Sequence, residues 1–130
     1  MMVLVDYNLN GYVVLLQGAL ASGGWLDLLP IYFVLFEEAG LAIDSSDRVV
    51  WRYAQTNQMI LLTANRRMKD EDSLEQTIRE ENTLTSLPVV TIGSVGRLSN
   101  REYREQCGAR LAEIIMYLEN YVGVGRVFIP

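Results

Sequence analysis

Carboxylate, hydroxyl and amide side chains gather at the ends of two short apolar runs in this 130-residue chain. Residues 2–5 and 59–63 have the length and apolar content of buried β-strands. The polar side chains at or beyond their ends are Asp6 and Asn8 at the first run, and Thr63 and Asn65 at the second. Mg²⁺ and Mn²⁺ prefer oxygen ligands of this kind, and such a cation can activate water for attack on a phosphodiester bond. The residue types therefore indicate metal-dependent hydrolysis of a phosphate ester.

A second group of acidic residues lies where helices are expected to begin. Asp47 opens one helical pattern, and Asp70 and Asp72 precede another. In a parallel sheet the helices begin at the edge where the strands end, so these carboxylates are expected near Asp6. Carboxylates that converge on one crevice repel one another, and a bound divalent cation offsets that repulsion. Asp6, Asp47, Asp70 and Asp72 are thus the candidate metal ligands, with at most one of Asp70 and Asp72 expected to serve.

Basic residues that follow the second run are candidates for substrate contact. Arg66, Arg67 and Lys69 could hold a phosphate backbone that the net charge of −5 would otherwise repel. Each candidate also has a structural explanation. Charge runs are usually solvated, acidic residues in a first helical turn are stabilised by the helix dipole, and asparagines are common in turns. An acid at a strand end can also be held by a salt bridge or a turn.

Segments typical of strands and helices alternate along the chain. Strands are expected at residues 2–5, 59–63, 88–92 and 127–129, and helices at 12–20, 31–39, 47–54, 74–82 and 99–121. Asp72 with Glu75, and Ser99 with Glu102, have the spacing of capping boxes. Residues 25–29 are expected to form a short strand or an irregular segment, because Pro30 disfavours a helix before it. The alternation favours an α/β fold around a parallel sheet, whose strand order the pattern does not reveal.

Composition limits the protein to a few classes. One hundred and thirty residues, 50% hydrophobic and 21% charged, predict one globular domain spanning 1–130. One cysteine and no histidine exclude a disulfide framework, a histidine-dependent triad and a Cys/His zinc site. No secretory signal is evident and the apolar stretch 25–36 is too short to span a bilayer, so a cytoplasmic location is expected. The apolar excess, with Trp25, Trp51, Tyr53 and Tyr117, suggests a homodimer.

Three pieces of the chain resemble the small PIN-like family. They are Leu4-Val5-Asp6-Tyr7-Asn8-Leu9, Asp47 to Ala54 (DRVVWRYA) and Ile60-Leu61-Leu62-Thr63-Ala64-Asn65. That family typically shows a strand ending in Asp-Glu-Asn-Leu, a helix opening with Asp, and a strand ending in Thr-x-Asp. The resemblance covers roughly residues 3–72. It implies a three-layer α/β/α sandwich with a mostly parallel sheet and, in active members, Mg²⁺- or Mn²⁺-dependent ribonuclease activity, often in toxins paired with antitoxins.

The resemblance assigns roles to particular residues. Asp6 matches the acid of the first strand and Asp47 the acid of the helix, while Asn65 falls on the Asp of Thr-x-Asp and Tyr7 replaces the Glu. Asp70 or Asp72 could restore the missing charge. The expected catalytic residues are therefore Asp6, Asp47, Asp70 and Asn65, and the expected substrate-binding residues are Asn8, Thr63, Arg66, Arg67 and Lys69.

Two alternatives remain at this point. The first is a catalytically inactive PIN-like module that acts through protein contact, as a homodimer or with an antitoxin-like protein. The second is a receiver-like domain that binds phosphate or a nucleotide, which the lack of a glycine-rich loop or lysine directly after a strand disfavours.

Overall fold

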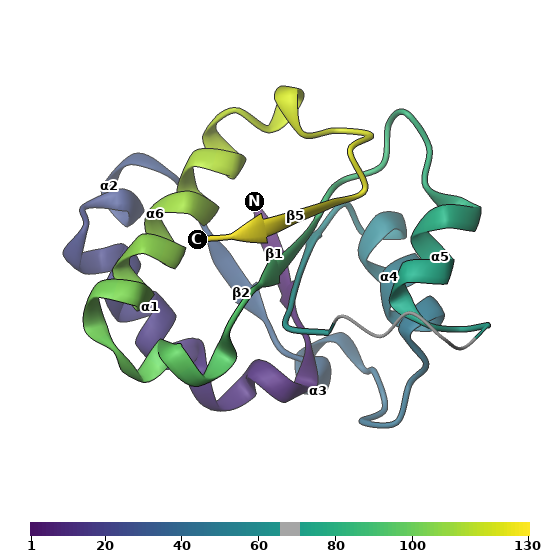
Figure 1. Ribbon diagram of the computed structural model, residues 1–130, viewed down its shortest axis with the longest axis horizontal. Coiled ribbons are helices and arrows are strands. Elements are labelled where there is room, and N and C mark those ends of the chain that lie inside the picture. Colours follow the sequence, from purple (N-terminus) through teal and green to yellow (C-terminus); the bar gives the residue numbers. More distant parts are fainter. Residues whose placement is uncertain (66–70) are drawn as a thin grey trace.

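A five-stranded sheet in which all strands run parallel forms the centre of the molecule (Figure 1). The structure is a computed structural model that describes residues 1–65 and 71–130. In chain order the strands are β1 (Met2–Val5), β2 (Tyr32–Val34), β3 (Ile60–Thr63), β4 (Val89–Ile92) and β5 (Arg126–Ile129). Their order across the sheet is β2-β1-β3-β4-β5. The α/β class and the parallel sheet expected from the sequence are confirmed.

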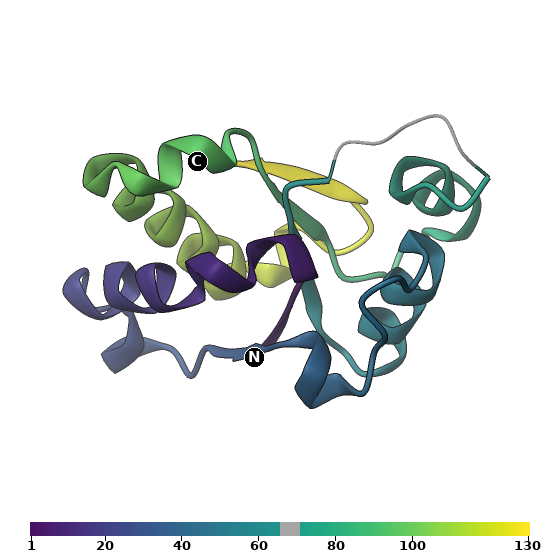
Figure 2. The same cartoon turned by 90° about the horizontal axis from the view of Figure 1, so that it is seen from below.

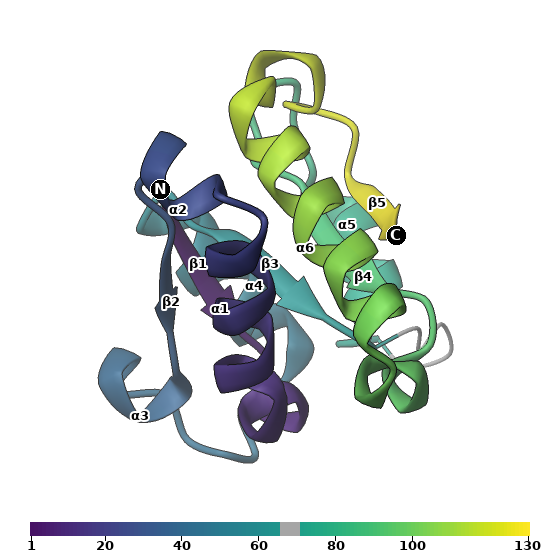
Figure 3. The same cartoon turned by 90° about the vertical axis from the view of Figure 1, so that its left-hand side faces the viewer.

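Helices cover both faces of the sheet and produce a three-layer arrangement (Figure 2). On one face, α1 (Val13–Ser22) packs beside α6 (Arg101–Met116), and Figure 3 shows this pair in front of the sheet. On the other face lie α4 (Asp47–Thr56) and α5 (Leu74–Glu81). Shorter pieces connect the layers: α2 (Trp25–Leu28), α3 (Phe36–Ala39), and the 3₁₀ helices η1 (Tyr7–Tyr12), η2 (Val95–Ser99) and η3 (Leu118–Asn120). No helix among the described residues is both long and apolar enough to cross a membrane.

Alternation along the strands divides the core into two clusters. Val3 and Val5 of β1 belong to the cluster beneath α1 and α6, whereas Leu4 belongs to the cluster beneath α4. Leu61 of β3 joins Leu4 in the second cluster. Because side chains alternate with a period of two, the next positions on this side are Asp6 and Thr63. The polar strand ends therefore face α4 and α5.

The side of the sheet on which the chain adds its next strand changes between β1 and β3. From β1 the chain leads first to β2 on one side, and then to β3, β4 and β5 on the other. The helices that follow strands on the two sides of such a point diverge, and this leaves a crevice beyond the carboxyl ends of the strands. Asp6 follows β1 and Asn65 follows β3, so both lie at this crevice.

The expectation of one helix over 31–39 is wrong. Residues Tyr32–Val34 form the edge strand β2, whose Phe33 lies opposite Val3 of β1, and only Phe36–Ala39 is helical. Pairing with β1 outweighs the helical spacing of these apolar residues, and aromatic and branched side chains suit a strand. Residues 25–29 are also mispredicted, because Trp25–Leu28 is the short helix α2, preceded by Gly24 with a φ of 77°.

The residues that cap α5 and α6 differ from those that the capping-box spacing predicts. Ser73, and not Asp72, caps α5 by accepting a hydrogen bond from the Gln76 backbone N–H. Asn100, and not Ser99, caps α6 through the N–H of Tyr103. α6 ends at Met116 instead of continuing to 121. In both helices the capping side chain is one residue further along the chain than expected.

Candidate functional site

Asp6 is fixed at the carboxyl end of β1 by its contacts with the end of β3. Its backbone N–H donates to the Leu62 carbonyl at 2.9 Å, which extends the β1–β3 pairing by one residue. The Thr63 hydroxyl, itself fully buried, donates to Asp6 Oδ2 at 2.6 Å. The same hydroxyl accepts the Asn65 backbone N–H at 2.9 Å. Thr63 therefore orients both the carboxylate and the turn that leaves β3.

The environment of Asp6 opposes its ionisation. Burial raises the pKa of Asp6 above its ordinary value of 3.8, and the negative charge of Asp47 raises it further. Hydrogen bonds from Thr63 and from the Tyr7 backbone act in the opposite direction and lower the pKa. Two acidic residues from distant parts of the chain are thus close enough to repel each other, as expected from the sequence.

Asp47 lies at the starts of two helices. It is the first residue of α4, which Ser46 caps through the N–H of Val49. Its Oδ2 also accepts the backbone N–H of Leu74, the first residue of α5, at 3.1 Å. The positive ends of both helices favour a carboxylate at this position. Asp47 therefore joins α4 to α5, and this structural role accompanies its closeness to Asp6.

Arg126 is a buried cation near Asp47. It lies at the start of β5, and its side chain is 8% exposed. Nη1 donates to the Asn65 carbonyl and to the Thr91 hydroxyl, both at 2.7 Å, and Nη2 lies 3.4 Å from Glu75 Oε2. Burial lowers the pKa of Arg126, while the charges of Glu75 and Asp47 oppose that shift.

Sequence reasoning missed Arg126. The available signal was a charged residue next to the apolar run 127–129, because a charge beside a buried strand needs partners. The same argument singled out Asp6. The partners of Arg126 are the Thr91 hydroxyl on β4 and the carbonyl of Asn65, which follows β3. Neither could be identified as a neighbour of Arg126 without the strand order.

The remaining predicted site residues are not all brought together. The Asp72 carboxylate is 63% exposed and pairs with Arg48 Nε at 3.0 Å, and Arg48 also pairs with Glu81 of α5, so the described partner of Asp72 lies between α4 and α5. Asn8 lies exposed in η1. Asn65 follows β3 and contributes its backbone to the contacts with Thr63 and Arg126. Asp70, Arg66, Arg67 and Lys69 lie outside the described residues.

Two residues at the crevice have the donor type that a divalent cation would need. Within residues 1–65 and 71–130, no three acidic, cysteine or histidine side chains are grouped as metal ligands. Asp6 and Asp47 nevertheless supply carboxylate oxygens, the type of donor that Mg²⁺ and Mn²⁺ prefer. A cation between them would relieve the repulsion that raises the pKa of Asp6. These two residues are those that would hold the metal.

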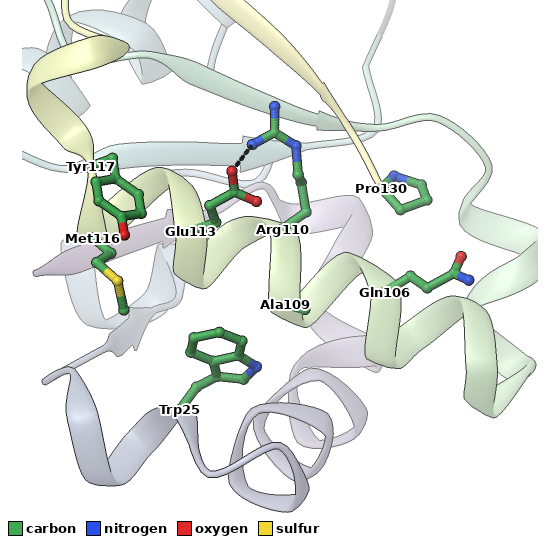
Figure 4. Close-up of a pocket in the computed structure, with 8 residues that line it drawn as sticks. All are labelled: Trp25, Gln106, Ala109, Arg110, Glu113, Met116, Tyr117 and Pro130. Atoms are coloured by element: carbon green, nitrogen blue, oxygen red, sulfur yellow. Dashed lines mark ion pairs between the residues drawn. The ribbon is translucent and has the colours of Figure 1, made fainter.

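A groove also lies on a part of the molecule away from Asp6 and Asp47. It has a volume of about 630 Å³ and runs between α2 and α6, with Trp25 facing Ala109, Met116 and Tyr117 in Figure 4. The ion pair between Arg110 and Glu113, 3.6 Å apart, lies along its wall. Its lining is mainly apolar, and none of the predicted site residues contributes to it.

The site as a whole is two acids and one buried cation at the switch point of a parallel sheet. Asp6, Asp47 and Arg126 come from β1, α4 and β5, which are widely separated in the sequence. Ligands in open α/β sheets bind at this place. Comparison of the chain with models of protein families, with curated proteins and with solved structures found no match.

Proposed function

We propose that this protein is a PIN-like ribonuclease that depends on Mg²⁺ or Mn²⁺ and hydrolyses RNA phosphodiester bonds. The observation that carries the proposal is the convergence of Asp6 and Asp47 at the switch point, where burial and then the charge of Asp47 raise the pKa of Asp6. Keeping a half-buried acid beside a second acid costs folding free energy, and such arrangements concentrate at functional sites. The resemblance of the surrounding segments to the PIN-like family supports the same conclusion.

Each residue of the site would have a separate task. Asp6 and Asp47 would hold the cation through carboxylate oxygens, and Thr63 would keep the Asp6 carboxylate in place. A bound divalent cation supplies an activated water and stabilises charge on the phosphate. Arg126 would hold the Asn65 carbonyl and thereby the end of β3. Asp70 is proposed as a further acid.

The RNA backbone requires positive charge that the chain as a whole lacks. The net charge is −5, so affinity for a polyanion must come from a local group of cations. Arg66, Arg67 and Lys69 are proposed for this role, with Asn8, exposed in η1, beside the crevice. Binding through such contacts would weaken steeply as salt is added.

Cleavage of a short single-stranded RNA tests the proposal. We expect cleavage in Mg²⁺ or Mn²⁺ and none in EDTA. Asp6→Asn should slow cleavage by at least about a hundredfold, the usual effect of removing a group that stabilises the transition state. Asp27→Asn is the control, because Asp27 is an exposed acid on α2 and its loss changes the net charge equally. Equal rates for the parent and Asp6→Asn would refute the assignment.

Arg126 favours a second candidate, a PIN-like module without catalysis. It places a positive charge near Asp47 that could serve in place of a metal, and within the described part of the chain no third acid joins the pair. Such a module would act through protein contact, as a homodimer or with an antitoxin-like protein. It predicts no stabilisation by Mn²⁺ and a solution mass of twice that of one chain, measured by sedimentation. A Mn²⁺ site of millimolar or higher affinity would count against it.

A further inference from the structure

A cavity of about 480 Å³ has Tyr7, the residue after Asp6, in its wall. It lies between η1 and α3, which meet at the carboxyl edge of the sheet at the bottom of Figure 1. Its walls include Tyr7, Asn10, Phe36, Glu37 and Ile43. The volume falls within the range of small-ligand sites. Because Tyr7 directly follows Asp6 in the chain, a group bound here would be close to the proposed cation.

The cavity offers an aromatic surface for stacking. Tyr7 is 40% exposed, although it lies in the wall of a cavity. Phe36, which is 3% exposed, lies behind it, with the ring centroids 6.3 Å apart and the planes inclined by 46°. Phe36 thus supports one side of the Tyr7 ring and leaves the other accessible. A nucleobase stacks on a ring of this kind whatever its sequence.

The cavity has polar groups in its wall, of which only the Glu37 carboxylate is purely a hydrogen-bond acceptor. Asn10 Oδ1 is buried, and it makes no hydrogen bond to any part of the chain that the structure describes. Glu37 adds an exposed carboxylate from α3. Because this oxygen has almost no solvent-accessible surface, the accessible acceptors of the cavity are the two carboxylate oxygens of Glu37. A base with N–H groups along its edge fits these acceptors better than a base that presents mainly oxygens.

We propose that this cavity binds the nucleobase next to the phosphodiester bond that is cut, and that it prefers guanine. Tyr7 stacks on the base, and the Glu37 carboxylate accepts the parallel N1–H and N2–H donors of the guanine edge. The inference rests on the proposed ribonuclease function. It also gives a role to Tyr7, which stands where the PIN-like family has Glu.

Binding of nucleoside monophosphates in EDTA tests base recognition separately from catalysis. We expect GMP to bind more tightly than AMP, CMP or UMP in isothermal titration. Glu37→Gln replaces one acceptor by a donor, so GMP affinity should fall by about tenfold or more, the usual cost of losing a bidentate contact. Glu38→Gln is the matched control, since Glu38 is the adjacent acid on α3 and its Oε1 accepts the Leu35 N–H instead. Unchanged GMP affinity in Glu37→Gln would overturn the guanine assignment.

Two further variants test the stacking surface. Tyr7→Ala should weaken all four mononucleotides by about tenfold, whereas Tyr7→Phe should retain most of the parental affinity. Tyr32→Ala on β2 is the control, because Tyr32 is 61% exposed and lies away from the cavity walls. If Tyr7→Ala binds mononucleotides as the parent does, the cavity is not the base site.

The two proposals fail in different ways. If the protein binds GMP through Tyr7 and Glu37 but cleaves no RNA, the base site stands and the ribonuclease function is wrong. If it cleaves RNA and Glu37→Gln leaves both GMP binding and the preferred cleavage position unchanged, the ribonuclease function stands and the base site is wrong.

Discussion

Asp6 is held where the folded protein favours its neutral form. Burial and the charge of Asp47 raise the pKa of Asp6 above 3.8, so the folded chain holds this proton more tightly than the unfolded chain does. Ionising Asp6 therefore costs folding stability. That cost is absent below pH 3.8 and fully present above the raised pKa. An acid kept at such a cost is consistent with a functional role rather than a structural one.

Asp6→Asn should therefore gain stability relative to the parent as the pH rises. In EDTA, the difference in unfolding free energy between variant and parent should increase as the pH rises above 3.8 and level off above the raised pKa, because only the parent has an acid to ionise at this position. Urea titrations at several pH values measure it. A difference that stays constant with pH, or that changes in the parent's favour, would contradict the raised pKa.

Thr63→Val should destabilise the fold by about 1–3 kcal/mol, the usual cost of leaving buried hydrogen-bonding groups without partners. Valine has nearly the same shape, but it removes the bonds to Asp6 Oδ2 and the Asn65 N–H. Urea denaturation measures the change, and Thr56→Val, an exposed position at the end of α4, is the control. A change below about 0.5 kcal/mol at Thr63 would show that this hydrogen-bond pair contributes little.

The sequence could identify Asp6, Asp47 and Thr63, but not all of their partners. Asp6 and Thr63 could be predicted because strand ends meet at one edge of a parallel sheet. Arg126 could not, since its side chain contacts groups from β3, β4 and α5. Asp72 carries the same charge as Asp47, yet a salt bridge holds it to Arg48, which also pairs with Glu81 of α5. Charge alone does not distinguish these two positions.

The packing of α6 against α1 can be tested with a glycine-to-alanine substitution in α6. Gly108 lies buried inside α6, and a Cβ added there would lie 3.5 Å from Leu20 Cδ2 and 3.6 Å from the Ala19 Cβ, which are ordinary contact distances. Gly108→Ala should stabilise the protein by about 0.5–1 kcal/mol, because alanine loses less backbone freedom in a helix than glycine does.

The same substitution at Gly123 should destabilise the protein, in contrast to Gly108→Ala. Gly123 has a φ of 84°, and an added Cβ would lie 2.8 Å from the Leu84 carbonyl oxygen. We expect a loss of at least about 1 kcal/mol, because a side chain is strained in this backbone conformation. Urea unfolding of both variants measures the contrast. Equal effects at Gly108 and Gly123 would contradict the packing described for these two glycines.

Elements that the sequence predicts well are those with a strong local signal. The strands β1, β3, β4 and β5 are apolar runs bounded by polar residues or glycine, and α1 and α4 have clear helical spacing and end or start signals. β2 was missed because its apolar residues also fit a helix, and only pairing with β1 decides between the two. The caps at Ser73 and Asn100 were misplaced by one residue because several neighbours are equally good caps.

For the whole molecule, we propose that β1 and β3, with α4, build one cation site at the switch point of the sheet. The proposed site contains residues 6, 47 and 63, which only the tertiary structure brings together. A cation that binds the folded protein and not the unfolded chain raises the unfolding temperature. The effect does not depend on knowing which RNA is the substrate.

The direct test of this cation site is thermal unfolding of the parent and of Asp6→Asn in EDTA and in Mn²⁺. At about one hundred times the dissociation constant, Mn²⁺ should stabilise the parent by roughly 2.7 kcal/mol, a shift of several degrees for a domain of this size. Asp6→Asn should show no shift, and the control Asp27→Asn should behave as the parent. If Mn²⁺ leaves the parent unchanged, or shifts Asp6→Asn equally, there is no cation site at Asp6.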